Sequence, residues 1–229
     1  MRPGNTNLIL AISILAGLAV AAKPSANTSE SDEDELLRHA TAVFERAVET
    51  RPAAISAAVL MRSVAIAIVP TAVKGGARYC GKEFVSARAE GMDYWTPPAV
   101  IAFQGTIPLD LETEVADFVV IAQTRRGLEY LIQERFASAP SPSIAAGELG
   151  HSAPVLTSAD LLAYMQFDKY FAGVTIDEWV VQEVRASNAA LYGRPYSTDD
   201  ILRGAGFFHL PGAARMWRNA IAGYFREMS

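Results

Sequence analysis

The chain has 229 residues, of which 51% are hydrophobic and 20% are charged, and its formal net charge at pH 7 is −5. This length and apolar content are enough for one sizeable core, so the composition excludes general disorder and favours a single domain. The acidic balance argues against a nucleic-acid-binding protein, because nucleic acids attract basic surfaces.

Residues 1–22 have the features of an export signal. Arg2 precedes an apolar run from Leu8 to Ala22, and small residues at the end of the run fit a signal-peptidase site. The run is shorter than the roughly 20 residues that a membrane-spanning helix needs. We therefore expect a cleaved signal peptide and an exported protein that is periplasmic or secreted and peripheral on a membrane. An uncleaved N-terminal anchor is the alternative.

An acidic leader, residues 23–34, precedes the first predicted helix. Ser31 and Asp34 have the spacing of a capping box, and apolar residues recur at helical spacing from Leu36 to Val48. The pattern predicts an amphipathic helix whose apolar face covers a sheet.

The middle of the chain is predicted to form strands, because short runs rich in Val, Ile and Phe alternate with Gly, Pro and Asp. These strands are Val64–Val69, Phe84–Arg88, Ala99–Gln104, Val115–Ala122, Leu161–Phe167, Ala172–Ile176 and Trp179–Val184. Further helices are predicted over Arg125–Phe136 after a Thr124 cap, after Ser197, and over Gly212–Met228.

These elements predict an α+β fold: a single domain with a mainly antiparallel β-sheet covered by amphipathic helices. Closure of the sheet into a barrel is left open. The predicted domain spans residues 35–204, and residues 205–229 add a C-terminal amphipathic helix. The aromatic residues of this tail are expected to dock on the domain's own sheet, with docking on a partner as the alternative; they are Phe207, Phe208, Trp217, Tyr224 and Phe225.

One segment combines glycines with positive charge. The apolar strand that ends at Val69 and Pro70 is predicted to open into a glycine-rich loop, where backbone N–H groups and cations together suit an anion. The residues concerned are Lys74, Gly75, Gly76, Arg78 and Lys82. The alternative is structural: these cations face the acidic residues of 89–124 on neighbouring strands and neutralise them.

Cys80 is the only cysteine of the chain, so an intrachain disulfide is excluded. A lone cysteine is most often a small buried apolar group, and we expect this for Cys80.

An enzyme is the less favoured reading of this sequence. There is no nucleophile elbow, no His-Glu-x-x-His and no Walker loop, and the three histidines lie far apart. His151 follows a glycine in a predicted loop and is the candidate for an alternative hydrolase. Asp110, Glu112 and Glu114 alternate as in a calcium or acid/base site, but an exposed strand face explains them more simply. No catalytic residue, metal or cofactor is therefore expected.

Several short motifs occur in an order that resembles the SYLF domain. They are Ile68-Val-Pro70, Lys74-Gly-Gly76, Arg78-Tyr79-x-Gly81-Lys82, Trp95-x-Pro97-Pro98-Ala99, Phe171-Ala-Gly-Val174 and Asn188-Ala-Ala-Leu-Tyr-Gly-Arg194. The similarity covers roughly residues 35–204, which is most of the chain that follows the signal peptide.

The resemblance implies non-enzymatic binding of phospholipid. Phosphoinositides are the best-known ligands of the eukaryotic members, and actin is a partner of some fungal members. For this chain it implies binding of anionic head groups at a membrane surface, with Val69, Val73 or Trp95 touching the acyl region. The implied lipid-binding residues are Lys74, Gly75, Gly76, Arg78, Lys82 and Lys169. No protein partner is identified, and a periplasmic structural or protein-interaction module without lipid specificity is the alternative.

Overall fold

The computed structural model describes residues 31–49, 54–89, 94–108, 113–133, 144–146, 159–204 and 210–228. The predicted signal peptide lies outside these residues. The helices are α1 (Asp32–Glu49), α2 (Ala57–Met61), α3 (Arg125–Ile132), α4 (Arg185–Tyr192), α5 (Thr198–Leu202) and α6 (Gly212–Met228). The strands are β1 (Ala65–Gly75), β2 (Arg78–Ala87), β3 (Ala99–Thr106), β4 (Val115–Ala122), β5 (Ile144–Ala146), β6 (Leu161–Phe167), β7 (Tyr170–Gly173) and β8 (Asp177–Glu183).

All the strands belong to one sheet with the order β5-β6-β4-β1-β2-β3-β8, and β7 pairs with β6 beside this path. Every pairing is antiparallel except that of β5 with β6. In the part of the chain that the structure describes, β5 and β8 lie at opposite edges and the sheet is open. The predicted α+β fold is confirmed, and the sheet does not close into a barrel.

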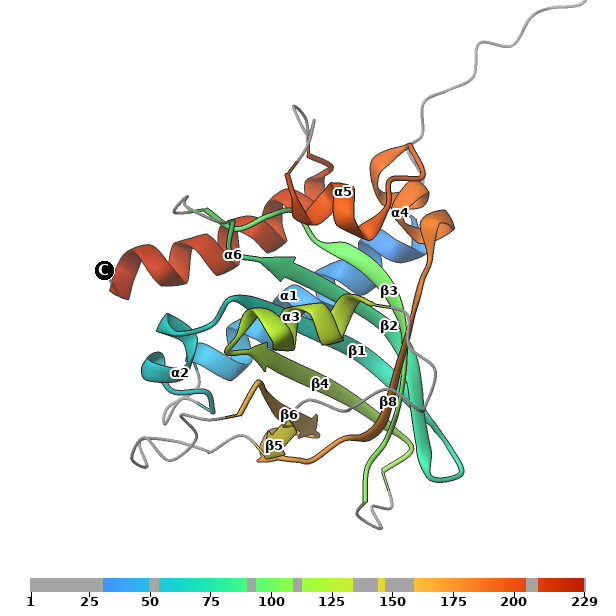
Figure 1. Cartoon of the computed structure of the whole chain (residues 1–229), viewed down its shortest axis with the longest axis vertical. Helices are drawn as coiled ribbons and strands as arrows, with labels where there is room; N and C mark the ends of the chain where they lie inside the picture. The colour runs from blue at the N-terminus through green and yellow to red at the C-terminus, as the bar shows by residue number, and fades with distance from the viewer. Residues whose placement is uncertain are drawn as a thin grey trace, which may run out of the picture.

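Two apolar cores lie on the two faces of this sheet (Figure 1). Alternation along β1 sends Ala65, Ala67 and Val69 to one face and Ile66 and Ile68 to the other. We call the face covered by α3 and α5 the inner face and the face covered by α1 and α6 the outer face. Because β1 is buried on both faces, its first six residues are apolar without the polar alternation of an exposed strand.

The predicted ends of the helices are confirmed at three places. Ser31 Oγ accepts the backbone N–H of Asp34 at 3.1 Å, so the capping box opens α1 as expected. Ser197 opens α5 with a full capping box. Helix α6 has the predicted bounds, and Trp217 and Phe225 are buried against the outer face. Self-docking of the tail is confirmed for these two residues, whereas Phe207 and Phe208 lie outside the described residues.

The bounds of two predicted elements need correction, and three elements are additional. Helix α3 ends at Ile132 because Gln133 is extended, with φ −87° and ψ 127°, so the helix does not reach Phe136. Strand β7 covers Tyr170–Gly173, so it begins two residues and ends three residues earlier than predicted. Helices α2 and α4 and strand β5 were not predicted, because each is too short to show a clear period.

Candidate functional site

The glycine-rich segment is a β-hairpin, and the predicted loop is wrong. Strand β1 continues through Pro70 to Gly75 and pairs with β2 up to Gly75 opposite Arg78. Pro70 has no N–H to give to a ladder, and the register of β1 shifts there against both neighbouring strands. Thr71 takes a φ of 49° at this bulge, and its backbone N–H is held by Asp117 Oδ1 at 2.8 Å. The chain therefore crosses the break as a bulge and stays in the sheet.

The hairpin turns at Gly76, which takes a φ of 68°, a conformation that glycine adopts at little cost. The backbone of Lys74 and Gly75 is still part of the sheet, where Lys74 pairs with Tyr79. Their N–H groups are thus engaged by neighbouring chain, as in the bond from Lys74 N to the Glu114 carbonyl at 2.7 Å. The hairpin can offer an anion its side chains, but it is not an open cradle of backbone donors.

Two of the predicted cations hold acidic partners. Arg78 Nη2 lies 2.9 Å from Glu178 Oε2 of β8, and Lys82 Nζ lies 2.5 Å from Glu33 Oε1 of α1. Partial burial by itself would raise the pKa of Glu33, but the hydrogen bonds from Lys82 and Ser187 outweigh it and lower that pKa. The structural alternative was right that acids neutralise these cations. The acids, however, come from β8 and α1 and not from residues 89–124.

Lys82 therefore belongs to the contact between α1 and the sheet, away from the tip of the hairpin. Its side chain is on the outer face and its carboxylate partner is mostly buried. Lys74, Arg78 and Lys169 lie nearer the tip, Lys169 in the turn between β6 and β7. The structure thus brings three of the four predicted cations to one end of the sheet.

The same end of the sheet exposes apolar side chains. Val73 and Val115 face each other across β1 and β4 and are 57% and 50% exposed, and Tyr170 beside Lys169 is 67% exposed. Val73 is therefore available to touch a membrane, as the resemblance implied. Val69 and Trp95 are not, because they are 0% and 3% exposed and belong to the two cores. We call Val73, Val115 and Tyr170, together with Lys74, Arg78 and Lys169, the hairpin end.

The charge of the hairpin end is mixed. Acidic side chains stand close to the cations in sequence and in the sheet; they are Glu114, Asp168, Asp177 and Glu178. Attraction to an anionic surface therefore depends on a few side chains and not on a strong positive field.

Cys80 is exposed, so its predicted burial is wrong. It lies opposite Val73 in the β1–β2 ladder, where the outer face extends beyond the helices that cover it. The side chain of Cys80 lies on the same face of β2 as those of Lys82 and Phe84. Phe84 is buried and Lys82 is partly covered by α1, whereas Cys80 is exposed.

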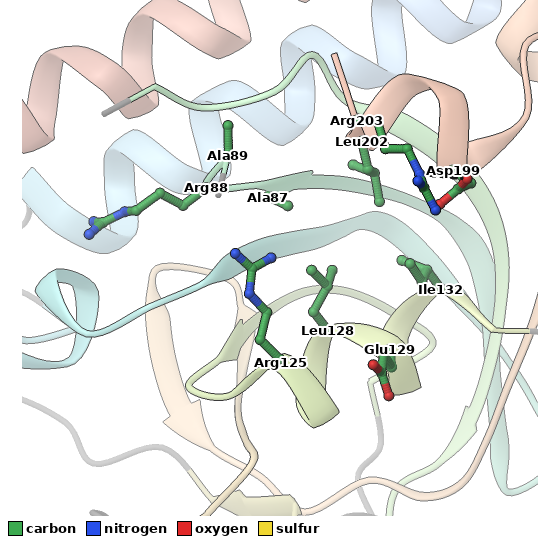
Figure 2. Close-up of a pocket in the computed structure, with 10 residues that line it drawn as sticks. All are labelled: Ala87, Arg88, Ala89, Arg125, Leu128, Glu129, Ile132, Asp199, Leu202 and Arg203. Carbon is green, nitrogen blue, oxygen red and sulfur yellow. Dashed lines mark ion pairs between the residues drawn. The ribbon is translucent and has the colours of Figure 1, made fainter. Parts of the chain in front are cut away.

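A pocket of about 580 Å³ lies at the opposite end of the sheet, between α3, the end of β2 and the region of α5 (Figure 2). Leu128 and Ile132 of α3, Ala87 of β2 and Leu202 of α5 give it apolar walls. Arg125, the first residue of α3, extends its guanidinium toward Ala87 and Ala89 in Figure 2. No sequence pattern predicts this pocket, since its walls come from segments about 40 and 70 residues apart that meet only in the fold.

No group of residues with catalytic geometry emerges from the predicted candidates. His151, Asp110 and Glu112 lie outside the described residues, and Glu114 is exposed. His39 of α1 contacts the sheet, because its Nε2 lies 3.0 Å from Asp117 Oδ1 of β4. Within the described ranges there is no cluster of three or more metal-ligating side chains.

Among the described residues, no helix combines the length and the hydropathy that crossing a bilayer requires.

Comparison with known proteins supports the motif resemblance. The model of the family Ysc84, described as "Las17-binding protein actin regulator", matches residues 106–224. No curated protein and no solved structure matches the chain. The matched segment includes α3, α4, α5, Lys169 and the part of α6 up to residue 224, whereas the β1–β2 hairpin precedes it. Because the match spans more than half of the chain, the protein belongs to the SYLF domain family, a family of lipid- and actin-related binding domains.

Proposed function

We propose that the protein binds anionic phospholipid at a membrane surface through the hairpin end, without catalysis and without a cofactor. One observation carries the proposal: Val73, Val115 and Tyr170 are solvent-exposed and share one end of the sheet with Lys74, Arg78 and Lys169. Exposed apolar side chains next to cations suit the boundary between acyl chains and anionic head groups.

The expected affinity follows from these few contacts. Burying an aliphatic side chain fully is worth about 1.5–3 kcal/mol. Val73 and Val115 are already about half covered, so together they contribute about 2 kcal/mol. Each Lys or Arg near an anionic surface adds about 1 kcal/mol. Since Arg78 already holds Glu178, we expect a total of about 4–5 kcal/mol, which corresponds to a dissociation constant of a few tenths of a millimolar to about 1 mM lipid.

The proposed setting is the outside of the cell membrane or the periplasm, reached through the predicted signal of residues 1–22. An exported protein would meet anionic phospholipids there in large excess, so weak and reversible binding is sufficient. The ligand is proposed at the level of the anionic head group, and a phosphoinositide is one member of that class.

Vesicle flotation of the chain without residues 1–22, at millimolar lipid, tests the proposal. We expect recovery with anionic vesicles at low salt, with less recovery at high salt or with neutral vesicles. The double variant Val73→Thr/Val115→Thr keeps the β-branched shape but makes the surface polar, and we expect it to weaken binding about tenfold. Met216→Gln is the control, because Met216 is 50% exposed on α6, away from the hairpin end.

A second pair of variants tests the charges. Lys74→Gln/Lys169→Gln removes about 2 kcal/mol, so it is expected to lose about thirtyfold in affinity for anionic vesicles and to lose most of the salt dependence. Arg215→Gln/Arg226→Gln removes the same charge from the exposed side of α6 and should float like the wild type. Equal recovery of the wild type with neutral and anionic vesicles would overturn the proposal. In that case the structural or protein-interaction module would be the better description of the domain.

A further inference from the structure

The pocket between α3 and α5 has the construction of a ligand site and lies apart from the hairpin end. Its β2 wall is Ala87, which pairs with Ala65 at the far end of β1 from the hairpin turn. A volume of about 580 Å³ lies within the range of roughly 300–1,000 Å³ that is usual for small-molecule sites.

The walls of the pocket are apolar where they are deepest. Ala87 and Leu128 are 2% and 7% exposed, and Ile132 and Leu202 are half-buried beside them. Ile132 and Leu202 pack against the inner core from α3 and α5, so these walls are held by the fold itself. The pocket therefore offers a fixed apolar surface to a ligand.

Three arginines border the pocket, but their guanidinium groups are used differently. Arg203 Nε lies 2.8 Å from Asp199 Oδ2, so its charge is neutralised at the rim. The guanidinium carbon of Arg88 lies 4.9 Å from the Phe225 ring centre and 5.5 Å from that of Trp95, and in Figure 2 this group points away from Arg125. Arg125 differs, because the described part of the chain shows no ion pair or hydrogen bond for its side chain, and Figure 2 shows it reaching across the pocket.

We propose that this pocket binds a small amphipathic organic anion, with its carboxylate or phosphate on Arg125 and its apolar body against Leu128, Ile132 and Leu202. A guanidinium binds both kinds of acid group through paired N–H donors. Neutral apolar molecules would cover the apolar walls without using the charge of Arg125, which is exposed, and small hydrophilic anions would leave the apolar walls uncovered. The inference goes beyond the proposed membrane contact, since the two sites are at opposite ends of the sheet.

Calorimetric titration with octanoate tests the pocket. Octanol, which lacks the acid group, and inorganic phosphate, which lacks the apolar chain, are the comparison probes. We expect saturable octanoate binding and at least about tenfold weaker binding of either comparison probe. Arg125→Gln should weaken octanoate binding about tenfold or more, and Ile132→Trp should block it by filling the pocket. Arg126→Gln is the matched control, because Arg126 is the next residue of α3 and faces Asp160, with 3.6 Å between Nη1 and Oδ2. Circular dichroism confirms that each variant is folded.

Vesicle flotation of Arg125→Gln distinguishes a free ligand from a membrane lipid. Unchanged flotation together with lost octanoate binding supports the proposal. Equal binding of octanoate by Arg125→Gln and Arg126→Gln would overturn it. Absence of octanoate binding by the wild type would overturn it too, whether or not Arg125→Gln reduces flotation. Because the hairpin variants test the membrane contact separately, the two proposals fail independently.

Discussion

At the scale of single residues, Glu83 is the least expected feature of the fold. It lies on the inner face of β2, its side chain is 0% exposed, and within the described residues neither carboxylate oxygen has a hydrogen-bond partner. Burial raises the pKa of Glu83 well above its ordinary value of 4.5. A charged carboxylate without a partner is very costly in an apolar core, so the neutral acid is the form that fits there.

This burial predicts a pH dependence of stability. Below about pH 4.5 the carboxyl is neutral in both the folded and the unfolded chain. Above that pH the unfolded chain releases the proton while the folded chain keeps it, so Glu83 lowers the free energy of unfolding by up to about 1.4 kcal/mol per pH unit until the folded carboxyl also ionises. Glu83→Gln removes the titration, and its stability relative to the wild type should therefore increase from pH 5 to pH 7.

Urea unfolding of the wild type and of Glu83→Gln at pH 5, 6 and 7 measures this difference. Glu114→Gln is the control, because Glu114 is exposed and should run parallel to the wild type. A constant difference between Glu83→Gln and the wild type over this range would show that Glu83 does not titrate differently in the folded chain.

At the scale of elements, the sequence predicted those strands and helices whose pattern is local. Val115–Ala122 and Gly212–Met228 were predicted with their true bounds, because an apolar run bounded by turns and an amphipathic period are both visible in one segment. The β1–β2 hairpin was not, since Pro70 interrupts the alternation and the bulge that absorbs it depends on Asp117, 46 residues away. The ion pair between Lys82 and Glu33 could not be predicted from the sequence either, because the two residues meet only when α1 packs on the sheet.

Asp117 is the residue that fixes α1 and the bulge to each other. Its carboxylate accepts hydrogen bonds from the Thr71 N–H at 2.8 Å and from Arg46 Nη2 at 3.4 Å. It also lies 3.0 Å from His39 Nε2. Asp117→Ala removes the acceptor of the exposed Thr71 N–H at the bulge and also removes two contacts to α1. We expect it to lower the free energy of unfolding by about 2 kcal/mol and to speed amide exchange in α1 and around Thr71.

Chemical unfolding combined with hydrogen–deuterium exchange checks this prediction. Asp177→Ala is the control, because Asp177 is exposed at the start of β8 and should change stability by less than about 0.5 kcal/mol. If exchange in α1 were as slow in Asp117→Ala as in the wild type, the carboxylate would not be what holds the helix.

At the scale of the whole molecule, one sheet separates two cores. Trp179 packs in the inner core, whereas Trp95 and Trp217 pack in the outer core. The outer core depends on both ends of the described chain, since α1 and α6 cover it together and Trp217 Nε1 donates to Ser86 Oγ of β2 at 2.7 Å. Because both cores share the strands β1, β2 and β4, loss of one core exposes one side of the strands that form the other. We therefore expect the domain to unfold as a single cooperative unit.

Fluorotryptophan labelling tests this cooperativity, because the three tryptophans give one ¹⁹F signal each and report separately on the two cores. Ile221→Ala removes a fully buried side chain of α6 from the outer core and should cost about 2–4 kcal/mol. The urea midpoint of Trp179 in the inner core should then fall by as much as those of Trp95 and Trp217. Ile221→Val should shift all three midpoints by a smaller, common amount, and Met216→Ala, on the exposed side of the same helix, should leave them nearly unchanged. A Trp179 midpoint that stays at the wild-type value in Ile221→Ala would mean that the inner core survives loss of the outer one, and the sheet would then be stable with α3 and α5 alone.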